Sequence, residues 1–164
     1  MTATGGRSSR EKGAKAERAL VAYLVELGLE AKRTASGYHQ DGGDIYWPSS
    51  PYVVDVKHQE RVRLPEWWRE VADEALELHR RPVLVLRRPN APNPAGWAAL
   101  ELAEAPSEAD AVVESQRVRF WHEWNRTDAA ALLIALEDGA TWLRAVSVEA
   151  WITTHLATLE APNE

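Results

Sequence analysis

Four charged side chains in the first half of the chain have the types and spacing that phosphate-ester hydrolysis needs. Asp55 and Lys57 interrupt an otherwise apolar run, VVDVKHQ at residues 53–59, and stand two positions apart. Ionised groups are costly to bury unless they are paired or bound to a metal. Asp44 precedes Asp55 by eleven positions, and Glu17 lies among apolar neighbours further upstream. These four residues are the candidates for a catalytic or metal-binding site.

Side-chain alternation along a strand places Asp55 and Lys57 on one face, because successive residues point to opposite sides. A tight turn at residues 48–51 would bring the segment of Asp44 alongside that strand. Carboxylates without cysteine suit a hard cation such as Mg²⁺ or Mn²⁺, which polarises a phosphoryl oxygen and lowers the pKa of water. A lysine beside the cation can orient that water or stabilise developing charge. The pattern therefore indicates metal-assisted phosphodiester hydrolysis.

Asp55 and Lys57 by themselves have a simpler explanation. A plain ion pair at the end of a strand accounts for an acid and an amine two positions apart more readily than catalysis does. The addition of Asp44 on the adjoining strand and Glu17 on the preceding helix favours the catalytic interpretation.

Hydrophobic periodicity and turn residues predict the elements that must position these groups. Apolar residues of segment 11–28 recur at helical spacing, and Gly28 is suited to end that helix. Further expected elements are strands at 29–34, 44–47 and 52–57, a helix at 66–79 that follows Pro65, and strands at 83–86 and 97–102. This order, αβββαββ, predicts an α/β fold with a central mixed β-sheet flanked by helices.

The last third of the chain carries weaker patterns. A capping-box pattern at 107–110 predicts a helix that runs to about Trp124. Residues 130–147 could form a hairpin that turns at 137–139, or could begin with a helix, because alanine and leucine favour that state. Residues 148–160 are typical of a closing amphipathic helix. The expected organisation is a flexible basic arm at 1–10, a core at 11–102 and an extension at 103–164 packed on the core within the same domain.

Composition bounds the class of protein. The 164 residues are 45% hydrophobic, which is typical of one compact globular domain. No stretch approaches the roughly 18 to 20 apolar residues of a membrane span, and the N-terminal MTATGGRSSREKGAK has no apolar core of a secretory signal. The absence of cysteine excludes disulfides and thiolate chemistry and favours the cytoplasm.

Charge is distributed unevenly along the chain. Residues 1–88 carry a balance of +2 and residues 89–164 a balance of −8, within a net charge of −6. A basic first half is expected if that half faces a polyanion. An uneven distribution of helix-surface charges explains the asymmetry equally well.

The spacing of Asp44 and the triplet Asp55-Val56-Lys57 resembles the PD-(D/E)XK nuclease pattern. The segment KGAKAERALVAYLVELGLEAKRTASG resembles the opening of archaeal-type Holliday junction resolvases, and the resemblance extends over about residues 11–102. It implies a restriction-endonuclease-like (PD-(D/E)XK) core followed by a C-terminal extension. Two positions depart from the pattern. Gly43 stands where a proline is usual, and Asp55 stands where these resolvases usually have glutamate.

The resemblance also implies roles for particular residues. The implied catalytic residues are Glu17, Asp44, Asp55, Lys57 and Ser36, with Ser36 near the scissile phosphate. The implied metal ligands are Glu17, Asp44, Asp55 and the backbone carbonyl of Val56. The implied cofactor is Mg²⁺, with Mn²⁺ as a substitute.

Polar and basic residues around this set are expected to contact DNA. They are Arg10, Lys12, Lys15, Lys32, Arg33, Ser36, His39, Gln59, Arg61 and Arg63. A solvated tail explains the cations before Glu17 equally well, and a lone loop histidine such as His39 usually has no such role. Gln59 is preferred to His58 because alternation places it on the face of Lys57.

The combined hypothesis is a structure-selective endodeoxyribonuclease that resolves four-way (Holliday) junctions in DNA recombination and repair. A homodimer would make paired nicks in branched DNA, because symmetric substrates favour two-fold symmetric enzymes. Two alternatives stay open: another PD-(D/E)XK endonuclease that acts on flaps, ends or duplex sites, and a catalytically inert DNA-binding protein on the same fold. We expect no membrane association and a cytoplasmic location, or the host cytoplasm if the protein is phage-encoded.

Overall fold

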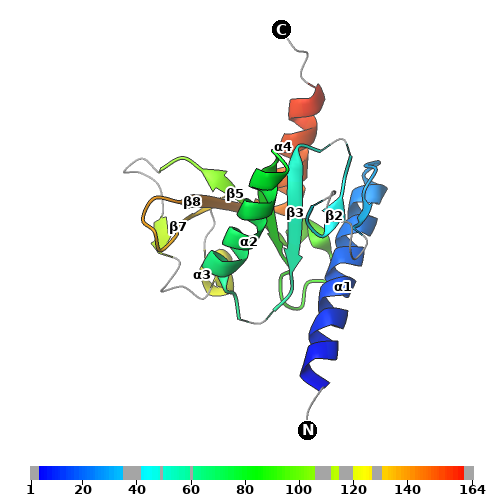
Figure 1. The fold of residues 1–164 in the computed structure, drawn as a ribbon, viewed down its shortest axis with the longest axis horizontal. Helices are drawn as coiled ribbons and strands as arrows, with labels where there is room; N and C mark the ends of the chain where they lie inside the picture. The colour runs from blue at the N-terminus through cyan, green and yellow to red at the C-terminus, as the bar shows by residue number, and fades with distance from the viewer. Residues whose placement is uncertain are drawn as a thin grey trace.

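The computed structural model describes residues 4–34, 42–48, 50–59, 61–105, 112–114, 120–126 and 131–160. Across these ranges, helices pack on both faces of an eight-stranded sheet (Figure 1). The helices are α1 (Thr4–Glu26), α2 (Leu64–Glu77), the 3-10 helix η1 (Pro94–Gly96), α3 (Phe120–Arg126) and α4 (Val148–Glu160). The strands are β1 (Lys32–Arg33), β2 (Ile45–Tyr46), β3 (Tyr52–Lys57), β4 (Arg81–Leu86), β5 (Ala98–Ala103), β6 (Val112–Glu114), β7 (Leu132–Ala135) and β8 (Trp142–Ser147).

The sheet is mixed, with the strand order β1-β2-β3-β4-β5-β8-β7-β6. Strands β3 and β4 are parallel, as are β6 and β7, and the other neighbours are antiparallel. Helix α2 makes the crossover that parallel strands require. In the β3–β4 register Lys57 lies beside Leu86, so the two strands end together at one edge of the sheet.

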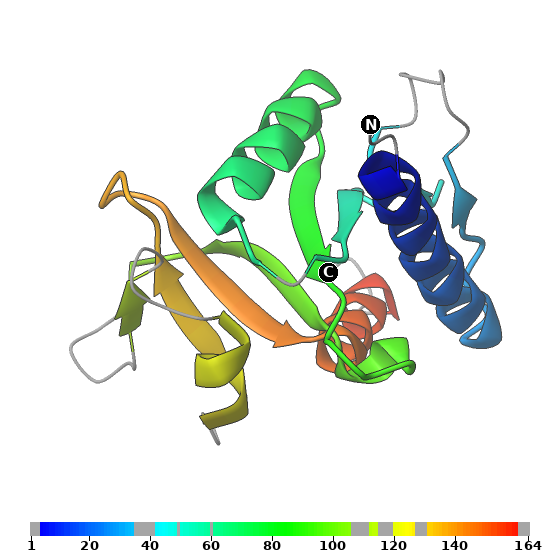
Figure 2. The ribbon, with the colours of Figure 1, turned by 90° about the horizontal axis from the view of Figure 1, so that it is seen from below.

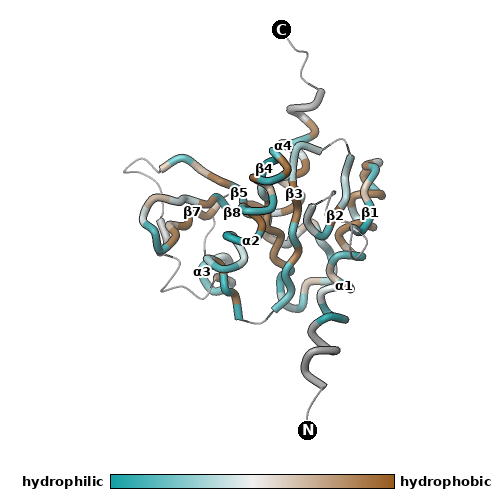
Figure 3. Tube along the Cα trace, viewed as in Figure 1, coloured by the Kyte–Doolittle hydropathy of each residue, from teal (hydrophilic) through white to brown (hydrophobic). Residues whose placement is uncertain are grey.

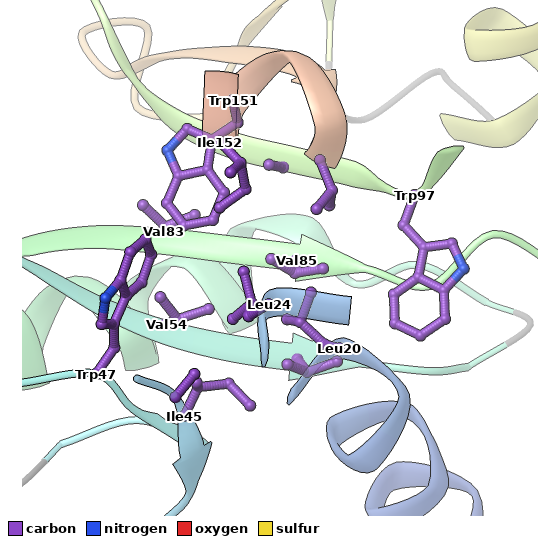
Figure 4. Close-up of a cluster of buried hydrophobic side chains, with 14 of the residues drawn as sticks. Leu20, Leu24, Ile45, Trp47, Val54, Val83, Val85, Trp97, Trp151 and Ile152 are labelled. Atoms are coloured by element: carbon purple, nitrogen blue, oxygen red, sulfur yellow. The ribbon is translucent and has the colours of Figure 1, made fainter. Parts of the chain in front are cut away.

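Two hydrophobic clusters cover the two faces of the sheet, and strand alternation separates them. Val54 and Val56 belong to the cluster of helices α1 and α4, whereas Val53 belongs to the cluster of α2 and α3. Figure 2 shows α2 and α4 on opposite sides of the strands, and Figure 4 shows Leu20 and Leu24 of α1 against the first of these faces. The apolar segments gather in the central strands (Figure 3). The face of β3 that carries Val53, Asp55 and Lys57 is therefore the face that α2 covers.

The predicted order αβββαββ is confirmed over the core, and β3 has the predicted bounds. Helix α1 begins at Thr4, so the backbone of residues 4–10 is helical where an arm was expected. The hairpin prediction for residues 130–147 is confirmed, because β7 and β8 are antiparallel and Leu136 N–H donates to the Thr141 carbonyl at 2.9 Å. The alternative that this segment begins with a helix is therefore wrong.

The predicted helix from residue 107 to about 124 is wrong in its first half. Strand β6 lies within that range, and the described part of helix α3 is Phe120–Arg126. Val112 and Val113 pair in parallel with Leu133 and Ile134 of β7. β-Branched residues that find an open strand edge favour the extended state, and this long-range pairing overrides the local capping pattern. The closing helix predicted at 148–160 is confirmed as α4.

Among the described residues, no helix is both long enough and apolar enough to cross a membrane.

Candidate active site

The backbone of β3 divides its hydrogen bonds between two neighbours. Arg87 N–H, after β4, donates to the Lys57 carbonyl at 3.0 Å, and Asp44 N–H, before β2, donates to the Val54 carbonyl at 2.9 Å. The N–H and C=O of one strand residue point to the same neighbouring strand. The backbone N–H and C=O of Val56 therefore point to the β2 side. They lie beyond Val54, which is the last residue of β3 that pairs with β2. The backbone polar groups of Val56 lie at an open edge of the sheet.

Asp44 occupies that open edge. Its carboxylate Oδ2 accepts a hydrogen bond from the backbone N–H of Val56 at 2.8 Å. Since the carbonyl of Val56 points to the same side as its N–H, a carboxylate and a backbone carbonyl lie together here. Asp44 and the Val56 carbonyl were both predicted as metal ligands, and they lie at the same edge of the sheet.

Gly43 explains how Asp44 arrives at this edge without the usual proline. Its φ is +69°, and a Cβ at this position would lie 2.6 Å from the Val54 carbonyl oxygen. Proline fixes φ near −65° and cannot adopt this conformation. The chain thus reaches Asp44 along a left-handed turn packed directly against β3.

Asp55 and Lys57 lie on the α2 face of β3, as alternation predicted. Asp55 is buried, with 8% of its surface exposed. Lys57 Nζ lies 3.4 Å from Asp55 Oδ2 and 3.3 Å from Glu70 Oε2. Glu70 belongs to α2 and was not predicted as a site residue. The feature of the sequence that could have identified Glu70 is its position one helical turn before Glu74. The charge of Glu74 also acts on Asp55.

The electrostatics of the two aspartates indicate a site that lacks positive charge. Burial, followed by the charge of Asp55, raises the pKa of Asp44 to about 7, with a smaller contribution from Glu17. Burial also raises the pKa of Asp55, against the opposing effect of Lys57. Burial by itself would lower the pKa of Lys57, but Asp55, Asp44 and Glu70 outweigh it and raise that pKa. Lys57 alone does not offset the neighbouring acids.

Glu17 of α1 lies close enough for its charge to act on Asp44, but it is engaged elsewhere. Its Oε2 lies 2.5 Å from Arg33 Nη2 and accepts a hydrogen bond from Arg33 Nε at 2.7 Å. The part of the chain that the structure describes contains no group of three or more histidine or acidic side chains that could hold a metal. Asp44 and Asp55 lie close enough for their charges to interact, whereas Glu17 is paired with Arg33.

The model of a protein family described as "Phage putative PDDEXK endonuclease" matches residues 8–95, which is more than half of the chain. The chain belongs to this family. The matched segment extends from α1 to η1 and contains Glu17, Asp44, Asp55 and Lys57. The predicted PD-(D/E)XK core is thereby confirmed, and the protein is a nuclease of this superfamily.

Among solved structures, the nuclease is similar to a Holliday junction resolvase of the hyperthermophilic archaeon Archaeoglobus fulgidus. The two are 20% identical, the match covers 58% of this chain and 79% of the resolvase, and the TM-score is 0.41. A likeness at this level says nothing about substrate. No curated protein matches the sequence significantly.

The oxygen ligands of the nuclease fit a hard divalent cation. Mg²⁺ is usually bound through one or two carboxylates and keeps several waters, so it does not need a cage built entirely from protein. Asp44 and the Val56 carbonyl supply a carboxylate and a neutral oxygen at the open edge, and Asp55 supplies a second carboxylate from the α2 face of β3. The raised pKa values of both aspartates are what an added cation would relieve.

The predicted DNA contacts on α1 and after β3 are surface residues. Arg10, Lys12 and Lys15 are exposed on α1, and Gln59 and Arg61 are exposed after β3. Their positions permit the predicted contacts without testing them.

Three other predicted contacts have partners within the protein. Lys32 Nζ lies 4.9 Å from the centroid of the Tyr46 ring, Arg63 forms an ion pair with Glu66 at 3.1 Å, and Arg33 holds Glu17. Ser36 and His39 lie outside the described residues.

Proposed function

We propose that the nuclease is a structure-selective, metal-dependent endodeoxyribonuclease that resolves four-way DNA junctions by phosphodiester hydrolysis. The observation that carries the proposal is the convergence of Asp44, Asp55 and Lys57 at the open end of β3. Membership in a PD-(D/E)XK endonuclease family supports the hydrolytic chemistry. The similarity of segment 12–37 to archaeal-type resolvases supports the choice of a branched substrate.

Asp44, Asp55 and the Val56 carbonyl would hold the divalent cation, which is Mg²⁺ with Mn²⁺ as a substitute. When bound, such a cation polarises a phosphoryl oxygen and acidifies a water molecule. Asp55 and Glu70 hold the Lys57 ammonium from two sides, so it can donate to the attacking water or to the developing negative charge. The water oxygen forms the new bond to phosphorus and gives up a proton, the bond from phosphorus to the leaving deoxyribose oxygen breaks, and that oxygen takes up a proton.

Glu17 and Arg33 would link DNA binding to the site. A DNA phosphate is a bidentate partner for a guanidinium and would compete with Glu17 for Arg33. Release from Arg33 would leave the Glu17 carboxylate near Asp44, where the sequence resemblance assigns a third metal ligand. Ser36, three positions after Arg33 in the sequence, would contact the scissile phosphate.

A homodimer would place two such sites on two opposed strands of the junction. Two-fold symmetric substrates favour two-fold symmetric enzymes, so paired nicks at symmetric positions are expected. Recognition would rest on phosphate geometry, which makes binding strongly dependent on salt. The mass of the protein in solution, measured by light scattering, checks the dimer.

The decisive experiment compares a synthetic four-way junction with a linear duplex of the same sequence, each with Mg²⁺ and with EDTA. Paired symmetric nicks in the junction, only with Mg²⁺, support the proposal. Equal cutting of the duplex would reject junction resolution and would favour the alternative of flap, end or duplex cleavage. Asp55→Asn and Lys57→Ala should both be inactive, and Mg²⁺-dependent cleavage by both variants would overturn the site assignment.

A further inference from the structure

Arg87 is a partly buried cation that follows β4, where β3 also ends, and it has no acidic partner among the described residues. Its backbone N–H donates to the Lys57 carbonyl, so it is directly beside the strand that carries the active site. Its Nη1 is buried and has no hydrogen-bond partner among the described residues. The guanidinium carbon lies 5.4 Å from the centroid of the Trp97 ring. A buried guanidinium donor with free hydrogen-bonding capacity calls for an anionic acceptor.

Trp97 makes the position of this guanidinium well defined. The indole is fully buried, and its Nε1 donates to the Ala91 carbonyl at 2.8 Å. Figure 4 shows Trp97 on the same side of the sheet as Val85 and Leu20. Stacking on an aromatic face orients an arginine fork and leaves its N–H groups available for a planar or tetrahedral oxyanion.

Other basic groups lie near Arg87 on this α1 face. His58 Nδ1 lies 3.5 Å from the Lys12 carbonyl oxygen, which joins the end of β3 to α1. The charges of Arg87, Lys12 and Lys15 all act on the His58 imidazole, so these three cations lie close to one ring. Within the described ranges, no acidic side chain forms an ion pair with Lys12, Lys15 or Arg87. The cluster is thus cationic and uncompensated.

The neighbouring Arg88, in contrast to Arg87, has a side-chain hydrogen-bond partner within the protein. Alternation sends it to the opposite face of the sheet, where its Nη2 donates to Asn125 Oδ1 of α3 at 2.7 Å. Arg87 has the same charge one position earlier, but its Nη1 has no hydrogen-bond partner among the described residues. The two arginines therefore differ in the face of the sheet on which they lie and in the side chains that they meet there.

We propose that Arg87, with Lys12, Lys15 and His58, forms a phosphate-binding site that holds a non-scissile backbone phosphate of the substrate DNA. The inference rests on the proposed function and deepens it, because it assigns a second phosphate contact on the α1 face of β3. The metal-binding acids and Lys57 act on the scissile phosphate, and this cluster fixes the register of the same DNA. A phosphate contact of this kind strengthens binding without reading sequence.

The test is DNA binding measured by fluorescence anisotropy in EDTA, with a labelled four-way junction and a labelled duplex at several salt concentrations. Arg87→Gln should weaken binding several-fold and reduce the slope of log affinity against log salt by about one. The matched control is Arg81→Gln, an exposed arginine at the other end of β4, which should leave the slope unchanged. Lys12→Gln, on the exposed surface of α1, should reduce the slope without any risk to the fold.

DNA that carries a neutral methylphosphonate at single positions identifies the contact. One position should weaken binding by the parent protein and have no further effect on Arg87→Gln. An unchanged slope in both Arg87→Gln and Lys12→Gln, or an equal loss in Arg81→Gln, would overturn the site. Equal affinity for junction and duplex would contradict junction resolution and leave the phosphate site standing, because both DNAs offer the phosphate.

Discussion

The carboxylate of Asp44 accepts a hydrogen bond from the backbone N–H of Val56, a residue twelve positions later, at 2.8 Å. This contact places the first acid of the site against the strand residue that lies between the second acid and the lysine. The left-handed turn at Gly43 makes the contact possible. The geometry of the site therefore depends on one turn as much as on its charged residues.

Asp44→Asn should raise the stability of the metal-free protein above neutral pH and abolish cleavage. The pKa of Asp44 is raised from 3.8 to about 7, so between these values the folded protein binds more protons than the unfolded chain. Stability is therefore lost as pH rises through this window. Asparagine keeps an acceptor for Val56 N–H and removes the charge. Calorimetry in EDTA should show a higher unfolding temperature for the variant at about pH 8 and none of that gain near pH 4. A lower temperature at about pH 8 would contradict the account.

Divalent cations should stabilise the parent protein more at alkaline than at acidic pH. Protonation of Asp44 and Asp55 competes with the cation, and both pKa values are raised. Adding Mg²⁺ or Mn²⁺ should raise the unfolding temperature clearly at about pH 8 and only slightly at about pH 5.5. The increase should shrink in Asp55→Asn and persist in Glu77→Gln, whose exposed carboxylate lies at the end of α2. Equal increases at both pH values would argue against cation binding by these aspartates.

Glu70→Gln tests whether α2 positions the catalytic amine. Glu70 is about half exposed and lies 3.3 Å from Lys57 Nζ, so its loss should change stability little. Cleavage should slow by about three- to tenfold, which corresponds to the modest strength of a partly exposed ion pair.

The pH profile distinguishes this role from a structural one. Glu70 raises the pKa of Lys57, so the alkaline limb of the profile should move to lower pH in Glu70→Gln. Glu77→Gln on the same helix serves as the control. An unchanged rate and profile in Glu70→Gln, with Lys57→Ala inactive, would remove Glu70 from the site.

Gly43→Ala should destabilise the fold by about 2 kcal/mol or more and reduce cleavage with it. The added Cβ would meet the Val54 carbonyl oxygen at 2.6 Å in a backbone conformation with φ of +69°. Gly96→Ala is the matched control, because nothing lies within 4 Å of the Cβ that it adds. Urea titrations of the two variants measure the difference. Similar stabilities for both would show that the turn before Asp44 relaxes freely.

His155→Phe should increase resistance to acid. His155 of α4 is buried, its ring lies 4.9 Å from Trp47 and 5.1 Å from Tyr52, and its Nε2 has no partner in the described part of the chain. Burial lowers the pKa of His155, so the unfolded chain binds more protons and stability is lost as pH falls below about 6.5. Phenylalanine keeps the ring packing and removes the titration. The variant should unfold at a higher temperature than the parent protein at about pH 5. An equal or higher unfolding temperature of the parent protein at that pH would contradict the prediction.

Local pattern was sufficient for much of the fold and part of the site. The apolar run of β3, its alternation and the helical spacing of α1 are properties of short segments, so they could be interpreted from the chain directly. The failure at β6 has the opposite cause. Val112 and Val113 are extended because a strand more than fifteen residues away offers a partner edge, and no local signal carries that information.

Short-range patterns in the sequence were enough to predict the order of the core elements, the shared face of Asp55 and Lys57, and the position of Asp44 beside that strand. These follow from the two-residue period of a strand and from short connections. Three relationships became visible only in the folded molecule: Glu70 holds Lys57, Glu17 is bound to Arg33, and Arg87 Nη1 has no partner among the described residues. These relationships join residues on different elements, and their geometry depends on how the helices pack on the two faces of the sheet.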